Sequence, residues 1–303
     1  MRNIAIVGGG KVGSVLGRLM VKGGGRIACV VSRTPGSAKR AAKFVKCKNA
    51  STSLESIPGN TDLIFVATPH GAIEDVARGL ANLQSLNFKR LAVCHASGML
   101  TADALEPVQR RGATVFSFHP LQTFPRDFDS EDIVDSARGI YYGVDGTRRA
   151  LRKARELARM LKGKLIEIKP EMRVLYHAAC VLASNHLTTM MWILESVYRV
   201  LQPKGNKPVF KPIIMATLNN IERTSPPEAL SGPIARGGVE TVAEHFKALR
   251  RYAPQFIPYF AMLSIETVKL AAVKGSITQD QGVALLELIQ KQLRTNLQTQ
   301  ETH

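Results

Sequence analysis

Three glycines close to the N-terminus have a spacing that can hold the phosphates of a dinucleotide. Gly8, Gly10 and Gly13 form the pattern G-x-G-x-x-G directly after the apolar run 4–7. In this pattern the first glycine makes a tight turn, the second lets the backbone approach a pyrophosphate, and the third lets a helix pack closely on a strand. The N–H groups at the start of that helix would bind the phosphates, and a plain glycine-rich turn is the alternative. The predicted cofactor-binding residues of this loop are Gly8, Gly10, Lys11, Val12 and Gly13.

The end of the next predicted strand, 26–33, indicates which nicotinamide cofactor is bound. In NAD enzymes a carboxylate about 20 residues beyond the glycines accepts a hydrogen bond from the ribose 2′-hydroxyl. Ser32 and Arg33 occupy that position here. A hydroxyl and a guanidinium suit the 2′-phosphate of NADP, which a carboxylate would repel. We therefore predict NADP, although a solvated arginine at a strand end has the same sequence.

Histidines occur at the ends of three consecutive predicted strands. Ligands of parallel sheets bind beyond the carboxyl ends of the strands, so these positions are expected to face the cofactor. Each histidine could instead be structural, and three together could bind a metal ion. The sequence offers no supporting carboxylate cluster, and we predict no metal. The three are His70 after the strand 62–68, His95 at the end of the strand 90–95, and His119 after the strand 114–118.

His119 is the first candidate for the catalytic acid or base. Pro120 fixes the backbone directly after it, and a pKa near neutrality is typical of a catalytic histidine. Ser97 is expected to hydrogen-bond the reacting group, and Gln122 to contact the substrate. The end of the strand 62–68 is expected to contact the cofactor through Ala67, Thr68 and Pro69.

Polar residues also interrupt an apolar helix predicted over 171–201. His177 and Ser184 would lie within about 20° of each other around a helix, and Asn185 about 80° from His177. A helix facing a cleft is one interpretation, with His177 as the second candidate acid or base, Asn185 bonding the reacting group and Ser184 contacting the substrate. A buried helix with locally satisfied polar groups is the other.

A loop of glycine and proline, SGPIARGG over 231–238, presents one arginine. Loops held between rigid helices often carry function. We expect Arg236 to bind a substrate carboxylate through both of its terminal nitrogens.

The elements that must position these residues fall into two parts. Apolar strands alternate with helices up to Pro170, a pattern that predicts a parallel sheet covered on both faces. Long helices follow. We therefore predict an α/β Rossmann doubly wound sheet that binds NADP over 1–170, and an all-α domain for substrate binding and dimerisation over 171–303. Helices are expected over 36–44, 73–86, 102–111, 208–224, 240–253, 255–273 and 279–296, with further strands over 49–52, 139–144 and 164–169.

The composition limits the class of protein. The chain has 303 residues, 45% of them hydrophobic and 21% charged, as is usual for a soluble globular protein. No apolar run is expected to cross a membrane, and the first strand starts too early for a leader segment. The four cysteines form no C-x-x-C and are expected to be reduced thiols of a cytoplasmic protein. The formal net charge is +17, but the basic residues are spread along the chain, so we predict no specific nucleic-acid partner.

The order of GGGKVG, ATP, CHASG, FHPLQTF, YHAACVLASN and GPIARGG resembles the Rossmann-like proteins with a C-terminal domain of unknown function numbered 2520 (DUF2520). The resemblance extends over nearly the whole chain. It implies kinship with 6-phosphogluconate and 3-hydroxyisobutyrate dehydrogenases, ketopantoate reductase, pyrroline-5-carboxylate reductase and prephenate dehydrogenase. Such kinship implies an NADP-binding N-terminal domain, an all-α C-terminal domain that often dimerises, and a substrate site in the cleft between them.

The sequence departs from this superfamily at two positions. Its hydroxyacid dehydrogenases use a Lys-x-x-x-Asn pair on the first long helix, whereas no lysine lies between Arg173 and Tyr198 here and His177 with Asn185 replaces the pair. Lysine-based acid catalysis therefore does not carry over, and the His-Pro at His119 instead resembles that of prephenate dehydrogenases. The arginine loop of the family ends in Arg-Gly-Asp, whereas Gly238 stands at the last position here.

Together these observations predict an NADP-dependent oxidoreductase. It would transfer hydride to or from a small carbonyl, hydroxyl or imine compound that carries a carboxylate, and it would form a homodimer. A non-catalytic NADP-binding sensor or assembly protein of the same fold is the alternative, which the missing lysine favours.

Overall fold

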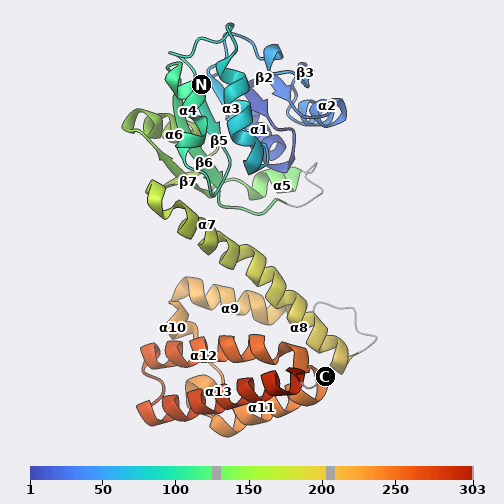
Figure 1. The fold of residues 1–303 in the computed structure, drawn as a ribbon, viewed down its shortest axis with the longest axis vertical. Helices are drawn as coiled ribbons and strands as arrows, with labels where there is room; N and C mark the ends of the chain where they lie inside the picture. The colour runs from blue at the N-terminus through green and yellow to red at the C-terminus, as the bar shows by residue number, and fades with distance from the viewer. Residues whose placement is uncertain (125–130, 203–208, 302–303) are drawn as a thin grey trace. The chain divides into compact units, whose positions relative to one another are not determined.

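The computed structural model describes residues 1–124, 131–202 and 209–301 (Figure 1). The chain divides into two compact units, Met1–His186 and Leu187–His303. The first contains a mostly parallel sheet of eight strands with helices around it, and the described part of the second is helical. The predicted fold class, a Rossmann-like α/β domain followed by a helical region, is confirmed. The packing groups residues 171–186 with the sheet, whereas the predicted sequence boundary lies after residue 170.

The strand order in the sheet is β3-β2-β1-β4-β5-β6-β7-β8. It reverses between β1 and β4, which is where doubly wound sheets bind their ligands. The strands are β1 (Asn3–Val7), β2 (Arg26–Val31), β3 (Ala50–Ser51), β4 (Leu63–Val66), β5 (Ala92–His95), β6 (Thr114–Pro120), β7 (Tyr141–Gly146) and β8 (Lys164–Glu167).

One strand runs against the prediction of a parallel sheet. β7 pairs antiparallel with β6, so that Ser117 lies opposite Asp145 and His119 opposite Gly143. An antiparallel neighbour needs no crossover helix, and the segment between β6 and β7 contains the short helix α5 (Glu131–Ser136). β6 is also longer than expected, so that His119 and Pro120 belong to the strand instead of following it.

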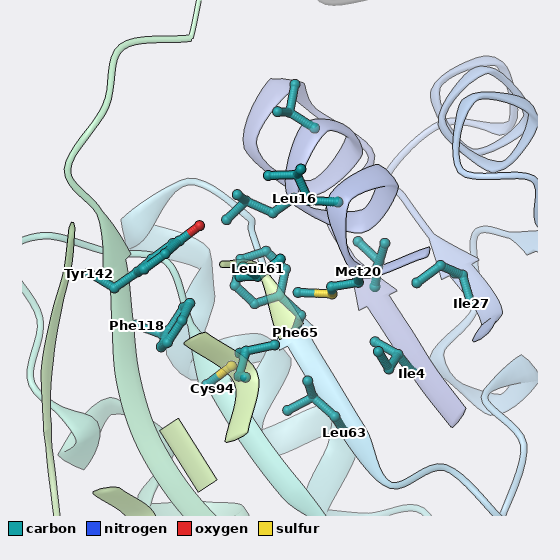
Figure 2. Close-up of a cluster of buried hydrophobic side chains, with 14 of the residues drawn as sticks. Ile4, Leu16, Met20, Ile27, Leu63, Phe65, Cys94, Phe118, Tyr142 and Leu161 are labelled. Atoms are coloured by element: carbon teal, nitrogen blue, oxygen red, sulfur yellow. The ribbon is translucent and has the colours of Figure 1, made fainter. Parts of the chain in front are cut away.

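Both faces of the sheet are buried under helices, because successive strand residues point to opposite faces. Ile4 and Ile6 of β1 pack on one face with α1 (Lys11–Lys22) and α6 (Arg148–Met160). Figure 2 shows part of this cluster, including Ile4 of β1 and Leu16 and Met20 of α1. Ala5 and Val7 pack on the other face with α3 (Ile73–Ala81). The strands are therefore almost continuously apolar because helices cover both faces of the sheet, as predicted. The remaining helices of this unit are α2 (Pro35–Phe44), α4 (Glu106–Arg110) and α7 (Arg173–Val181).

Three predicted helices are shorter or less regular than expected. The helix predicted over 73–86 ends at Ala81, and that predicted over 102–111 begins with a 3₁₀ turn, Ala102–Leu105, before α4. The helix predicted over 171–201 is interrupted by a π-helical turn, Leu182–His186, between α7 and α8 (Leu187–Leu201). Ser184 lies in this turn, and its hydroxyl is 2.8 Å from the Cys180 carbonyl oxygen. Such serine bonds to the preceding helical turn often bend helices.

The helical unit has a small core of its own. It is formed by α11 (Val239–Tyr252), α12 (Ile257–Lys274) and α13 (Gln279–Glu301), through residues such as Phe246, Ala261 and Ile289. α8 and α9 (Lys211–Arg223) contain no buried residue. Residue 208, where a helix was predicted to begin, lies outside the described residues. The short helix α10 (Pro226–Ala229) follows α9.

One helix corrects the expectation that no apolar stretch could cross a membrane. Pro254–Lys274, which includes α12, has 21 residues and is long and apolar enough by length and composition alone. That is weak evidence for a membrane span, because the core helix of a soluble protein has the same properties. Ile257, Ala261, Val268 and Ala271 of α12 are buried within the helical unit, and 33% of the apolar stretch is buried.

Candidate active site

The glycine loop forms one wall of a cavity of about 650 Å³ at the carboxyl ends of β1, β2 and β4, which we call the glycine crevice. Gly8 has a φ of +115°, and a Cβ there would lie 2.5 Å from the Ala67 carbonyl carbon. A Cβ on Gly13 would lie 2.0 Å from the Gly8 carbonyl oxygen. A Cβ on Gly10 would meet no atom within 4 Å. The first and third glycines are therefore required by packing, and the second faces open space where a ligand can approach.

The start of α1 is open to that space. Its N-cap, Gly10, makes no side-chain hydrogen bond to the helix, so the first N–H groups have no capping side chain. Helix N-termini of this kind bind phosphates. Lys11 and Val12, predicted to contact the cofactor, are partly exposed residues of this first turn. On the opposite wall, the crevice is lined by Ala67, Thr68 and Pro69, which are predicted to contact the cofactor. The buried Thr68 hydroxyl has no hydrogen-bond partner among the described residues.

The end of β2 gives the crevice a basic rim. The Ser32 hydroxyl accepts a 3.4 Å hydrogen bond from the Gly9 N–H, which ties the rim to the glycine loop. Arg33 is exposed and lines the crevice together with Arg40 of α2. Arg40 was missed by the sequence reasoning; it lies about one helical turn after Ser37, which also lines the crevice. No carboxylate is among the residues that line this cavity. The rim of the crevice is therefore positively charged.

A second cavity, of about 530 Å³, lies beyond the carboxyl end of β6. It brings together residues far apart in the sequence, from β6 and the turn after it, from α7 and from the π-helical turn. We call it the histidine pocket. Five predicted site residues line it: His119, Gln122, His177, Ser184 and Asn185. Three polar residues of the 171–201 segment therefore line a cavity, and the π-helical turn changes their spacing around the helix.

His119 is the centre of the histidine pocket. Its Nδ1 lies 2.9 Å from the Tyr176 hydroxyl oxygen, and its ring centroid lies 6.2 Å from that of His177. Gly98 packs against both rings, because a Cβ there would lie 2.9 Å from His119 Nε2 and 2.6 Å from His177 Cδ2. Tyr176 was missed by the sequence reasoning, even though it directly precedes His177.

The protonation state of His119 differs from the expectation of a pKa near neutrality. Burial, together with the positive charge of Arg173 and the neighbouring His177 and His95, lowers its pKa to about 4. His119 is therefore a neutral imidazole at physiological pH. Burial raises the pKa of Tyr176 well above its usual value, so that the phenol stays protonated beside it.

The other two strand-end histidines do not join this pocket. His95 is fully buried, with Nε2 2.8 Å from the Thr101 carbonyl oxygen and Nδ1 accepting the Ser97 N–H at 3.2 Å. Burial lowers its pKa to about 4, and both ring nitrogens are occupied, so it is a structural residue. His70 is exposed at the start of a 3₁₀ turn. Across the described residues, no three His, Cys, Asp or Glu side chains are grouped closely enough to hold a metal ion.

Of three further predicted residues, Ser97 and Gln122 have local structural contacts and Arg236 is exposed. The Ser97 hydroxyl accepts hydrogen bonds from the N–H groups of Met99 and Leu100, at 3.2 and 3.1 Å, and so holds the turn after β5. The Gln122 amide donates to the Ser136 carbonyl oxygen at 3.0 Å while its oxygen accepts the Thr123 N–H. Arg236 belongs to the helical unit, where it is exposed at the end of a 3₁₀ turn.

Comparisons with known proteins identify the two parts of the chain. A sequence profile for a Rossmann-like domain matches residues 2–120, and the profile of a domain of unknown function (DUF2520) matches residues 140–267. The resemblance proposed from the motifs is confirmed. No curated protein sequence matches the chain.

Solved structures share the fold. A candidate NADP oxidoreductase from Bacteroides fragilis matches with a TM-score of 0.70 at 19% identity, over 89% of this chain and 98% of its own. A reductive aminase from Aspergillus terreus, solved with NADPH and ethyl-5-oxohexanoate, gives 0.55 at 13% identity, over 97% and 94%. A prephenate dehydrogenase from A. aeolicus, solved with hydroxyphenyl propionate and NAD+, gives 0.52 at 14% identity, over 89% and 98%. At these identities the likeness concerns the fold.

Proposed function

We propose that this chain, in which a Rossmann-like domain is joined to a DUF2520 domain, is an NADP-dependent oxidoreductase. The observation that carries the proposal is the presence of two cavities at the carboxyl ends of strands of one sheet. One has an open glycine loop and a basic rim, and the other has a neutral histidine among hydrogen-bonding groups. The structurally similar proteins include oxidoreductases that use either NADP or NAD.

Different residues of the glycine crevice bind different parts of the cofactor. The N–H groups at the start of α1, beginning with Lys11, bind the pyrophosphate. Arg33 and Arg40 bind the 2′-phosphate, which Arg recognises with two parallel hydrogen bonds. Thr68 supplies a hydroxyl that has no other partner among the described residues. When bound, the nicotinamide supplies or accepts the hydride.

His119 acts in the neutral form. His119 Nδ1 and the Tyr176 hydroxyl oxygen are 2.9 Å apart. We propose that the hydroxyl, which keeps its proton, is the donor and that the imidazole proton is on Nε2. Nε2 then donates a hydrogen bond to the reacting oxygen or nitrogen as negative charge develops there, as a neutral imidazole can do in place of an imidazolium. Asn185 and Ser184 orient the substrate from the π-helical turn, and His177 is the second candidate for proton transfer. The turn residues Ser97 and Gln122 act by holding the backbone around the pocket.

We propose a small substrate that carries a carboxylate, with Arg236 as its binding residue. The support for this role is the loop 231–238, in which a single arginine stands among glycine and proline residues. Replacing Arg236 by Gln is expected to raise KM about tenfold or more with little change in kcat. Equal kinetic constants for Arg236→Gln and the wild type would remove this role.

The test of the overall proposal is a substrate panel followed by NADPH absorbance. The panel contains small oxo acids, hydroxy acids and cyclic imino acids, each assayed with NADPH and NADH or with their oxidised forms. Turnover that is lost in His119→Asn supports an oxidoreductase. Tight NADPH binding without turnover across the panel would favour the alternative, a non-catalytic sensor or assembly protein, which the absence of lysine between Arg173 and Tyr198 also favours.

We also propose that the protein is a homodimer held together by its helical unit. Trp192 of α8 and Ile213 of α9 are 60% and 64% exposed in the single chain. Exposed apolar patches of this kind mark interaction surfaces, and most soluble oligomers are symmetric homo-oligomers. Sedimentation equilibrium at micromolar concentration is expected to give twice the chain mass, and Trp192→Asp to give monomers. A monomeric wild type would contradict the proposal.

The cellular setting that we propose is the cytoplasm. Cys29, Cys47, Cys94 and Cys180 are separate thiols, as is usual where glutathione keeps thiols reduced. The proposed partners are the cofactor, the substrate and a second copy of the chain, without specific nucleic acid or membrane binding. Binding to nucleic acid with a steep salt dependence would contradict this.

A further inference from the structure

A buried arginine lies behind the histidine pocket and contacts neither of the proposed ligands. Arg173, the first residue of α7, is 0% exposed. Its Nη2 donates a 2.8 Å hydrogen bond to the Ser97 carbonyl oxygen, and its Nη1 lies 3.3 Å from Asp145 Oδ2. We propose that Arg173 is a positioning residue that holds the Ser97–Gly98 turn against the rings of His119 and His177. The inference rests on the proposed function of the histidine pocket.

Asp145 makes the position of this guanidinium specific. Its Oδ1 accepts the Ala102 N–H at 2.6 Å, and its Oδ2 accepts the Ser117 hydroxyl at 2.6 Å. The Asp145 N–H in turn donates to the Ser117 hydroxyl oxygen across the β6–β7 pair at 2.9 Å. The carboxylate thus cannot shift without breaking a bond to the backbone of the 3₁₀ turn and a bond to the Ser117 side chain of β6. Arg173 transmits that fixed position to the loop after β5.

The loop after β5 is packed tightly between the Arg173–Asp145 network and the rings of His119 and His177. The Ser97 hydroxyl closes the turn by accepting two N–H groups, and the next residue is Gly98. Since a Cβ on Gly98 would fall within 3 Å of atoms in both His119 and His177, the turn backbone already touches the rings. A displacement of the Ser97 carbonyl by a few tenths of an ångström would therefore change the space in front of His119 Nε2.

The charge of Arg173 acts on the same ring. The groups that influence His119 are Arg173, Tyr176 and His177 from α7, and His95 from β5. Arg173 and the two histidines disfavour its protonation. Asp145 partly neutralises Arg173, and its charge raises the pKa of His95 while Arg173 lowers it. Removal of the Arg173 charge should therefore raise the pKa of His95, and removal of the Asp145 charge should lower it.

The test is a histidine titration by NMR on the full chain, which needs no turnover. Imidazole resonances are followed from pH 3.5 to 8 in the wild type, Arg173→Met and the matched variant Asp145→Asn, with His119→Asn to assign the signal. We expect Arg173→Met to raise the pKa of His119 by about one unit or more. Asp145→Asn should destabilise the same network without raising that pKa. An unchanged His119 titration in folded Arg173→Met, or an equal rise in both variants, would overturn the inference.

A second variant decides the matter if Arg173→Met does not fold. Arg173→Lys keeps the positive charge. However, a single ammonium group cannot reproduce the planar guanidinium, whose two terminal nitrogens face the Ser97 carbonyl and Asp145. We expect amide hydrogen exchange at Met99 and Leu100 to rise at least tenfold while β1 amides keep their wild-type rates. If amide hydrogen exchange accelerated equally in all strands, or did not accelerate at Met99 and Leu100, Arg173 would have a structural role only. Failure of the substrate panel with these local effects present would refute the proposed function and leave the positioning role intact.

Discussion

The glycine crevice and the histidine pocket belong to the same unit, but backbone groups form most of the first and side chains form the second. The crevice is made mainly of backbone: a glycine turn, open N–H groups at the start of α1, and the end of β4. The pocket is made of side chains, and its central contact joins residues 57 positions apart, His119 and Tyr176. A backbone site tolerates changes of most side chains but no change of shape. A side-chain site depends on each group and on its protonation.

This difference predicts that variants in the two cavities change different constants. Changes in the crevice should alter cofactor affinity with little effect on the chemical step. Changes in the pocket should alter the chemical step with little effect on cofactor affinity. A variant that moves both constants equally would break the distinction.

The largest effect is expected for His119→Asn. Loss of one group that transfers or donates a proton costs about 10²–10⁴ in rate, so kcat should fall by that factor. The dissociation constant of NADPH should change less than twofold, because the phosphates are bound in the crevice. Tyr176→Phe, which removes only the partner of Nδ1, should cost about tenfold. Rates are measured per folded molecule, beside calorimetric titration of NADPH.

A stable, fully active His119→Asn would remove this residue from the mechanism. His177, the second histidine of the pocket, would then become the candidate. If His119→Asn weakened NADPH binding as much as it slowed turnover, the two cavities would not be functionally separate.

The next effect is expected in the crevice, for Arg33→Ala. A hydrogen bond to a charged group contributes about 1.5–3 kcal/mol, so that NADPH affinity should fall about 10- to 100-fold. NADH affinity should stay nearly constant, because NADH lacks the 2′-phosphate. Arg40→Ala should show the same selectivity with a smaller loss. Equal losses for NADPH and NADH, or equal affinities in the wild type, would refute recognition of the 2′-phosphate.

The low pKa of His119 in the histidine pocket should also make the free energy of unfolding depend on pH. The pKa of His119 is about 4 in the folded protein, below the ordinary value of about 6.5 that it regains on unfolding. Between these pH values the unfolded chain binds more protons, so the free energy of unfolding falls as the pH falls. The contribution of His119 is fully present above about pH 6.5, and about 1–3 kcal/mol of it is lost by pH 4. His95, whose pKa is also about 4, adds a similar loss.

Urea unfolding at a series of pH values from 4 to 7 measures this loss. His119→Asn should reduce the slope of stability against pH by up to one proton, while the contribution of His95 remains. An identical slope in the variant would show that His119 titrates in the folded state as it does in the unfolded state. Its neutral role in the pocket would then have no basis.

The same difference in construction explains what could be predicted from the sequence. The glycines and Ser32–Arg33 are local signals, because one strand-turn-helix unit and the following strand fix their positions. His119 and His177 were recognisable as polar residues at the end of a strand and on an apolar helix. Asp145 was missed by the sequence reasoning, although it is a single carboxylate in the otherwise apolar strand β7.

Other features depend on contacts that spacing does not encode. Arg173 acquires its role only by meeting Ser97, 76 residues earlier in the chain. The low pKa of His119 follows from burial and that arginine together. The antiparallel β7 and the π-helical turn depend on how the chain packs after β6 and around Ser184. The roles proposed for Ser97 and Gln122 could not anticipate that their polar groups hold turns.

The smallest expected effect, for Gly10→Ala, examines the crevice most closely. Gly10 has φ −81° and ψ −169°, an extended conformation that alanine adopts, and a Cβ there would meet no protein atom within 4 Å. The melting temperature should therefore change by less than about 3 °C, since only the modest N-cap preference for glycine is lost. A bound pyrophosphate approaches through that same space, so NADPH affinity should fall about three- to tenfold. Gly36→Ala is the matched control, because it is also open and lies in α2 outside the lining of the crevice. If both variants bind NADPH like the wild type, the space in front of Gly10 is not the phosphate site. If Gly10→Ala alone is weakened at unchanged stability, the second glycine serves the ligand and not the fold.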